Sequence, residues 1–232
     1  MKPAQRLSIL LALLLTCPVL AQDGVRDVAL KARDGLTLVG TWVQVSADSP
    51  TVILLHQLYS NRQGWSPIIE TLTANGYNVL AVDLRGYGQT RGRINWPKAL
   101  LDVADWAAWV RGQGVRDAIS MLGSSMGSVL AIVACGADPA CKTAIAISPG
   151  WEYYGIGVRV PLTEQFGERR VLVIYAERDR YPRQGVPRMV EAAPNVVTTL
   201  SYLGNAHGID MIRQTSDTSL PAILDWLAAH GQ

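Results

Sequence analysis

One short segment of this 232-residue chain constrains the fold more than any other: an apolar run, Ile119–Leu122, passes into a helical pattern through Gly123-Ser124-Ser125-Met126-Gly127. A connection this short forces a sharp strand-to-helix turn, and the strained backbone leaves no space for a side chain at either glycine. The turn lifts Ser125 above the edge of a sheet, at a helix N-terminus whose free N–H groups stabilise negative charge. The segment therefore predicts a candidate nucleophilic serine between a buried strand and a helix. A phosphate-binding loop is the alternative, but its Lys-Ser or Lys-Thr pair is absent.

The rest of the chain alternates between strand patterns and helix patterns. Strands are predicted at residues 25–32, 36–45, 51–55, 78–82, 118–122, 143–147, 171–175 and 198–202. Apolar residues at helical spacing predict helices over residues 66–74, 100–112 and 126–135, with a closing helix around 220–227. This alternation predicts an α/β domain over residues 22–232, with a mostly parallel central sheet of about eight strands and helices on both faces.

Composition and charge exclude several classes of protein. Hydrophobic residues make up 49% of the chain and charged residues 17%, whereas disordered chains have the reverse balance. Lys and Arg number 21 against 19 Asp and Glu, and no basic run concentrates the positive charge as in nucleic-acid binding proteins. Three Cys and three His without an HExxH or CxxC motif predict no zinc site. We therefore expect no nucleic-acid partner and no metal or other cofactor.

Residues 1–21 have the pattern of a signal peptide. Lys2 and Arg6 form a positive region, and the apolar run Leu7–Leu15 is shorter than the roughly 20 residues of a membrane-spanning helix. Small side chains up to Ala21 suit cleavage after that residue. The mature protein is therefore expected to be periplasmic or secreted, with no stable membrane span.

The alternatives to cleavage are an uncleaved anchor helix and lipidation at Cys17, for which Thr16 is a poor preceding residue. Cleavage removes Cys17 and leaves Cys135 and Cys141, an even number in an oxidising compartment. These two lie six positions apart with Gly and Pro between them, which permits Cα atoms about 4.4–6.8 Å apart. A disulfide is expected, and two small buried hydrophobic side chains are the alternative.

A serine hydroxyl becomes a nucleophile when a histidine takes its proton. His207 lies in the loop after the last predicted strand, at the sheet edge where Ser125 is expected. His56 belongs to a loop that precedes the serine, and His230 lies two residues from the end of the chain. His207 is therefore the predicted base.

The third group is an acid that holds the histidine in the right tautomer. Asp179 follows the predicted strand 171–175 and lies between Ser125 and His207 in the sequence. Glu177 is the second candidate, and an ordinary surface acid in a turn is the structural alternative.

The order Ser125, Asp179, His207, with a serine between two glycines, resembles the α/β-hydrolase superfamily over nearly all of residues 25–230. The segment Leu54–Leu58 resembles the family's His-Gly-x loop, with Gln57 in place of the glycine. By this resemblance the backbone N–H groups of Leu58 and Met126 would form the oxyanion hole.

A second segment, Asp83–Gly88, resembles the family's Asp-x-Arg-Gly-x-Gly turn, in which we expect Asp83 and Arg85 to be structural.

The interval Ser148–Glu168 is too short for the helical cap that large members of the superfamily insert. The chain therefore resembles small carboxylesterases without a cap and dienelactone-hydrolase-like proteins, although Ser125 departs from the cysteine nucleophile of dienelactone hydrolases proper. Tyr59, Trp151 and Tyr154 are expected to line a substrate pocket, with core packing as the alternative.

Together these features predict an exported serine hydrolase that cleaves small or exposed carboxylic esters through an acyl-enzyme. A peptidase or amidase with the same triad is one alternative, but we find no substrate-gating domain or amine-binding acids. A non-catalytic binding module on the same scaffold is the other alternative, which the complete set of serine, acid and histidine disfavours.

Overall fold

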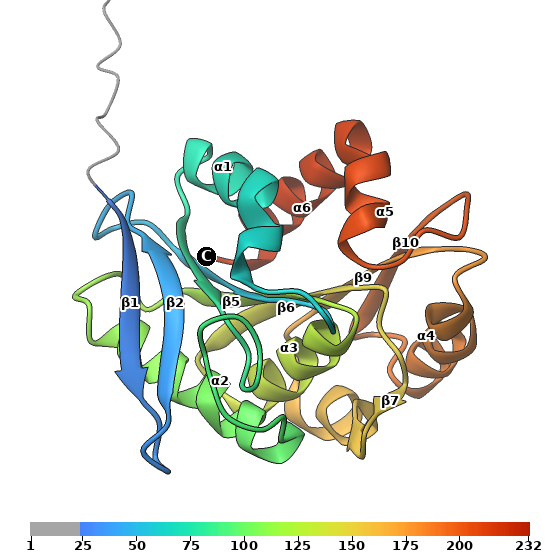
Figure 1. The fold of residues 1–232 in the computed structure, drawn as a ribbon. Coiled ribbons are helices and arrows are strands. Elements are labelled where there is room, and N and C mark those ends of the chain that lie inside the picture. The colour runs from blue at the N-terminus through green and yellow to red at the C-terminus, as the bar shows by residue number, and fades with distance from the viewer. Residues whose placement is uncertain (1–23) are drawn as a thin grey trace, which may run out of the picture.

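The computed structural model describes residues 24–232, so the predicted signal peptide and the alternative lipidation at Cys17 lie outside the described residues. Within that range the strands build an eight-stranded sheet in the order β1-β2-β4-β3-β5-β6-β9-β10 (Figure 1). The strands from β4 to β10 run parallel, whereas β1 and β2 are antiparallel to their neighbours. The expected mostly parallel sheet is confirmed. Its strands are β1 (Val25–Lys31), β2 (Thr37–Val43), β3 (Thr51–Leu55), β4 (Asn78–Val82), β5 (Ile119–Ser124), β6 (Cys141–Ile147), β9 (Val171–Ala176) and β10 (Val197–Tyr202).

Helices cover both faces of this sheet, and each face has its own apolar core (Figure 1). On one face lie α2 (Trp96–Arg111), α3 (Met126–Ala137) and α4 (Arg180–Ala192). On the other face lie α1 (Ser66–Ala74), α5 (Ile209–Gln214) and α6 (Ser216–His230). Every residue of β3, β4 and β5 is buried, because both faces of these strands are covered. This explains why their sequences are mostly apolar instead of alternating.

Two of these helices are absent from the sequence-based prediction. The α4 segment contains Pro182, Gly185 and Pro187, which argue against a helix when only the sequence is considered. In the structure Gly185 lies so close to the chain after β6 that a Cβ there would come 2.7 Å from the backbone nitrogen of Trp151. The α5 helix has only six residues, too few to show a helical period.

The segment between β6 and β9 is short, as expected. It contains a two-stranded hairpin, β7 (Glu152–Tyr153) and β8 (Ile156–Gly157), and one π-helical turn, η2 (Pro161–Gln165). We call residues 148–158 the flap. The flap extends from the carboxyl end of β6 toward α4.

The carboxyl ends of the six parallel strands place six loops at one edge of the sheet. The strand order reverses between β3 and β5, which is the position where open α/β sheets bind ligands. The loops after these two strands carry Leu58 and Ser125, while the loops after β9 and β10 carry Asp179 and His207.

The far end of α3 is held by a disulfide and by one arginine. Cys135 and Cys141 are joined, with Cα atoms 5.3 Å apart. The Arg169 guanidinium donates to the carbonyl oxygens of Cys135, Asp138 and Cys141 at 2.8, 2.8 and 2.9 Å. A cation at this position also interacts favourably with the helix dipole. In residues 24–232 no helix has both the length and the apolar character needed to span a bilayer.

Candidate active site

Ser125 occupies a strained turn between β5 and α3. Its backbone angles are φ 52° and ψ −116°, a conformation that costs a non-glycine residue about 1–3 kcal/mol. A Cβ on Gly123 would lie 2.0 Å from the carbonyl oxygen of Gly127, and a Cβ on Gly127 would lie 2.1 Å from that of Leu55. Close approach of the backbone therefore requires both glycines.

Three side chains that are distant in the sequence meet at this turn. His207 Nε2 lies 2.8 Å from Ser125 Oγ, and His207 Nδ1 lies 2.6 Å from Oδ2 of Asp179. An ionised carboxylate only accepts hydrogen bonds, so Nδ1–H donates to Asp179 and Nε2 is left to accept from the serine. The Asp179 carboxylate is buried, whereas the His207 side chain is 34% exposed. The structure thus brings together the three residues that the sequence nominates, in the arrangement a catalytic triad requires.

The other candidates for base and acid have different surroundings. His56 is buried, accepts from the Leu84 N–H through Nε2 at 3.0 Å and donates from Nδ1 to the Gln57 carbonyl at 2.7 Å. Burial lowers the pKa of His56. His230 packs against a tryptophan of α6, and Glu177 accepts from a serine of β10. None of the three contacts Ser125.

The two backbone groups proposed for the oxyanion hole are free to bind a ligand. In the described part of the chain, neither the Leu58 N–H nor the Met126 N–H donates a hydrogen bond to another protein group. Met126 directly follows the nucleophile and begins α3, and Leu58 lies in the loop after β3 on the neighbouring strand. Both N–H groups thus lie at the carboxyl ends of two neighbouring strands, and Ser125 follows one of these strands.

Gln57, which replaces the glycine of the family pattern, fixes this loop. Its side-chain oxygen accepts from Ser124 Oγ at 2.8 Å and from the Ile209 N–H at 3.0 Å. Gly208, next to the histidine, donates its N–H to Ser148 Oγ at 2.9 Å. The two Gln57 bonds connect the loop after β3 with β5 and with the segment that carries His207, and the Ser148 bond ties that segment to the end of β6.

The turn after β4 is structural, as expected. Asp83 accepts from the Arg62 backbone N–H at 2.9 Å and forms an ion pair with the Arg62 side chain. Arg85 pairs with Asp102 at 2.6 Å and with Asp34 at 2.9 Å. The hydrogen bond from Arg85 is the main reason why the pKa of Asp34 is lowered.

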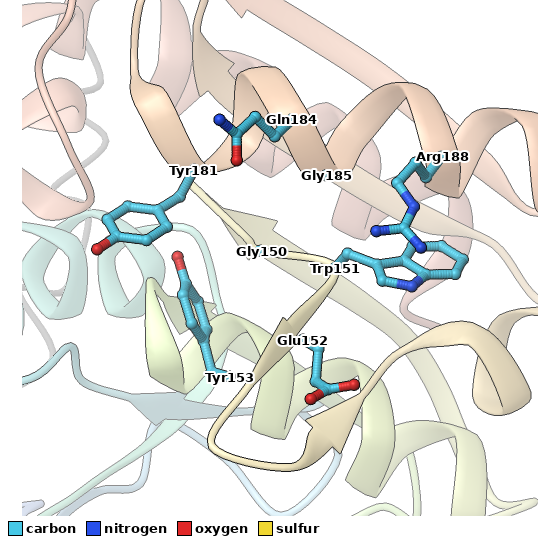
Figure 2. Close-up of a pocket in the computed structure, with 8 residues that line it drawn as sticks. All are labelled: Gly150, Trp151, Glu152, Tyr153, Tyr181, Gln184, Gly185 and Arg188. Atoms are coloured by element: carbon cyan, nitrogen blue, oxygen red, sulfur yellow. The ribbon is translucent and has the colours of Figure 1, made fainter.

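A cavity of about 440 Å³ lies directly beside Ser125. Tyr59 and Tyr154 line it as expected, and at 92% and 64% exposure they are not core residues. Trp151 instead lines a neighbouring cavity of about 430 Å³ (Figure 2). The Arg188 guanidinium lies 4.7 Å from the centre of the Trp151 indole and covers it. Trp151 therefore does not line the cavity beside Ser125, because its indole packs against Arg188 of α4.

One tyrosine and one acid at the site, Tyr181 and Glu152, were missed from the sequence. Tyr153, Tyr181 and Glu152 line both cavities. The Tyr181 ring lies 5.6 Å from that of Tyr153 and 6.0 Å from that of His207. Tyr181 could not be found because its helix α4 was not predicted, whereas Tyr153 belongs to the aromatic cluster of the flap.

Comparison with known protein families agrees with the fold described above. The sequence profile of the family described as alpha/beta hydrolase fold matches residues 50–163. The chain has the α/β-hydrolase fold. No curated protein matches it.

Solved structures extend the likeness of this chain beyond the matched segment. An esterase from Pyrococcus furiosus is 22% identical, with a TM-score of 0.76 over 90% of this chain and 91% of that chain. Est1E from Butyrivibrio proteoclasticus, solved with ferulic acid bound, is 16% identical, with a TM-score of 0.72 over 87% of this chain and 99% of that chain. An esterase from Exiguobacterium antarcticum is 12% identical, with a TM-score of 0.72 over 86% and 98%. At these identities the likeness establishes the fold.

Proposed function

We propose that this α/β hydrolase is a serine hydrolase that cleaves carboxylic esters through an acyl-enzyme. The observation that carries the proposal is the continuous hydrogen-bonded chain from Asp179 through His207 to Ser125 at a strained turn. A serine that only stabilised the fold would not require an unfavourable backbone conformation beside a cavity.

The chemistry follows from the positions of these groups. Ser125 Oγ attacks the ester carbonyl carbon while its proton passes to His207 Nε2. The carbonyl electrons move to the oxygen, which the N–H groups of Leu58 and Met126 stabilise. Asp179 stabilises the imidazolium, and His207 then gives its proton to the departing alcohol. Water activated by His207 hydrolyses the acyl-enzyme, and no cofactor takes part.

An ester is favoured over an amide as the substrate. Several proteins with similar folds are named esterases, and Est1E, which has a similar fold, was solved with ferulic acid bound. An amidase or peptidase with the same triad would use a carboxylate to hold the substrate amine. Contrary to the expectation that no such acid is present, Glu152 lines the cavity beside Ser125, so the amidase stays the alternative that the substrate panel tests.

The nucleophile is tested by Ser125→Ala. Loss of a triad nucleophile costs on the order of 10⁶ in kcat, so ester hydrolysis and labelling by a fluorophosphonate should both disappear. Ser201→Ala, which changes an exposed serine on β10, is the matched control and should behave as the wild type. Turnover by Ser125→Ala above about one per cent of the wild-type value contradicts the assignment, and so does a wild-type protein that neither reacts with the probe nor cleaves esters.

The substrate class is tested with a panel of p-nitrophenyl esters of increasing acyl length and aminoacyl amides. Higher kcat/KM on esters throughout is the expected result. Higher kcat/KM on aminoacyl amides, lost in Glu152→Gln, would favour the peptidase alternative.

We also propose that the protein is exported and that residues 1–21 are removed as a signal peptide. The bond between Cys135 and Cys141 supports an oxidising compartment. The mass of the mature protein after expression with its native N-terminus should correspond to a chain that begins at Gln22. A diacylglyceryl group on Cys17 would instead establish a lipoprotein.

A further inference from the structure

The hydroxyl of Tyr153 is buried beside the nucleophile and has no hydrogen-bond partner within residues 24–232. A buried hydroxyl left without a partner costs about 1–3 kcal/mol. Such groups are rare in folded proteins and call for an explanation. The tyrosine ring itself is only half-buried, so it is the polar end of the side chain that points inward.

The surroundings of Tyr153 fix the position of this hydroxyl. The ring lies against Gly150, where a Cβ would come 2.8 Å from the ring carbon that bears the oxygen. On another side the ring packs edge-on against Tyr181, with 5.6 Å between centroids. Figure 2 shows the Tyr153 hydroxyl directed toward the Tyr181 ring, with both tyrosines on the side opposite Trp151 and Arg188. Any side chain at position 150 would displace the phenol, so the glycine has a steric role here.

The protonation state of Tyr153 makes it a donor. Burial raises the pKa of the phenol well above its ordinary value, and the charge of Asp179 raises it further; the Ser125 hydroxyl opposes the shift because it lies close to the phenol, although the pair does not reach normal hydrogen-bond geometry in the resting state. The phenol therefore keeps its proton at neutral pH and cannot act as a base. It can only offer its O–H to a neighbouring atom that becomes more negative.

The burial of the hydroxyl also limits which atom can receive this hydrogen bond. Water does not reach the Tyr153 oxygen, so a substrate oxygen that enters from the cavity cannot reach it either. The reacting atom next to the phenol belongs to the protein itself, namely Oγ of Ser125. This atom gives its own hydrogen to His207, which leaves its lone pairs free to accept.

We propose that the Tyr153 hydroxyl is a catalytic hydrogen-bond donor to Oγ of Ser125, formed as the serine loses its proton. The proposal rests on the ester hydrolysis proposed above. In acylation Oγ bonds to the carbonyl carbon while its proton moves to His207 Nε2; the bond from that carbon to the alcohol oxygen then breaks, and the alcohol leaves with the proton from Nε2. In deacylation water bonds to the acyl carbon and gives a proton to Nε2; the bond between Oγ and that carbon then breaks, and Oγ takes the proton back from Nε2. The Tyr153 O–H bond stays intact in both steps and stabilises the charge that Oγ carries during transfer.

Tyr153→Phe tests this role because it removes only the oxygen. A neutral hydrogen bond of about 1.4 kcal/mol corresponds to about tenfold in rate, so kcat/KM should fall about tenfold. The fall should be equal for a p-nitrophenyl ester and an ethyl ester of the same acid, because the donor acts on Oγ and not on the leaving group. The rate constant for fluorophosphonate labelling of Ser125 should fall by a similar factor, and the KM for the esters should change less than twofold.

A matched control and a stability measurement separate this role from a structural one. Tyr202→Phe makes the same change on the half-buried tyrosine of β10, outside the cavity, and should leave all rates unchanged. Because the Tyr153 hydroxyl has no partner in the resting state, its removal should leave the Tm equal or higher. A lower Tm, or failure of Tyr153→Phe to fold, would mean that the hydroxyl has a structural partner and would overturn the proposal.

Two further outcomes overturn the proposal while the proposed function stands: wild-type rates in Tyr153→Phe, or a loss confined to the ester with the poorer leaving group. If instead the wild-type protein neither cleaves esters nor reacts with the fluorophosphonate, the proposed function itself is wrong.

Discussion

The amide oxygen of Gln57 joins three parts of the chain beneath the candidate active site. It accepts hydrogen bonds from Ser124 at the end of β5 and from Ile209 at the start of α5, while its own backbone leads into Leu58. A glycine at this position could not make these contacts. A side chain thus supplies the rigidity on which the positions of Leu58 and His207 depend.

Gln57→Met keeps most of the side-chain volume and removes this acceptor. The Ser124 hydroxyl and the Ile209 N–H then lack their partner, which should lower the free energy of unfolding by about 1–3 kcal/mol. Ester turnover should fall as well, because the loop that carries Leu58 loses its attachment. Urea denaturation and steady-state kinetics measure the two effects, with Gln63→Met on the exposed surface as the control. Wild-type stability in Gln57→Met would show that the three segments hold without this bond.

The candidate residues that directly follow predicted strands could be identified from the sequence. The candidate residues that are placed by three-dimensional packing could not. Ser125, Asp179 and His207 each follow a strand, and parallel strands deliver their carboxyl ends to one edge. The isolated hydroxyl of Tyr153 depends on the contact of its ring with Gly150. Nothing in the order of residues in the flap specifies which aromatic ring turns toward the serine.

Among the elements, α3 is the most enclosed helix of the site. Ten of its 12 residues are buried, and it begins at the nucleophile. At its other end the Arg169 guanidinium binds carbonyl oxygens on both sides of the disulfide. Burial lowers the pKa of Arg169, and the nearby Asp138 carboxylate, which pairs with Arg111, only partly opposes this effect. The helix is therefore fixed at both ends, which keeps Met126 and Ser125 in place relative to β5.

The disulfide between Cys135 and Cys141 should be present in the purified mature protein. Thiol counting under denaturing conditions without reductant should find no free thiol. Because the closed loop is short, the chain-entropy contribution is about 2 kcal/mol, so reduction or the double change to serine should lower the free energy of unfolding by that amount. Two free thiols would mean that the bond, or the exported location, is wrong.

At the scale of the molecule, most of the fold could be predicted from the apolar runs of the buried strands. One helix, α4, was not predicted because its sequence contains residues that normally break helices. Strands β3, β4, β6 and β9 were located to within two residues, because burial on both faces leaves a continuous apolar run. The helix α4 was missed because its interior prolines and glycine are tolerated only through packing against the flap. That contact joins segments far apart in the chain and has no local pattern.

The stability of the whole domain should depend on pH through His56. Burial lowers the folded-state pKa below the value of 6.5 for a free histidine, so the unfolded chain binds more protons at acidic pH. Neutral His56 makes its full contribution to the free energy of unfolding above about pH 6.5, and this contribution is lost as the pH falls below that value. A charged ring could no longer accept from the Leu84 N–H.

The measurement is the free energy of unfolding between pH 7.5 and 5.5. This free energy should decrease as the pH is lowered in the wild type. It should decrease less steeply in His56→Gln, although that variant is less stable at every pH. Equal slopes in the two proteins would exclude His56 as the source.

Because the flap is short, we expect a particular dependence of the rate on ester concentration when the ester is added above its solubility limit. Ser125 adjoins a cavity whose rim includes the exposed side chains of Tyr59 and Tyr154. No long segment has to swing aside in the described structure before a substrate enters. Lipases that open only at an oil–water boundary show a jump in rate when droplets form. Here the plot of rate against ester concentration should instead stay hyperbolic. The rate should stop rising once the ester reaches its solubility limit, because only dissolved ester enters the cavity.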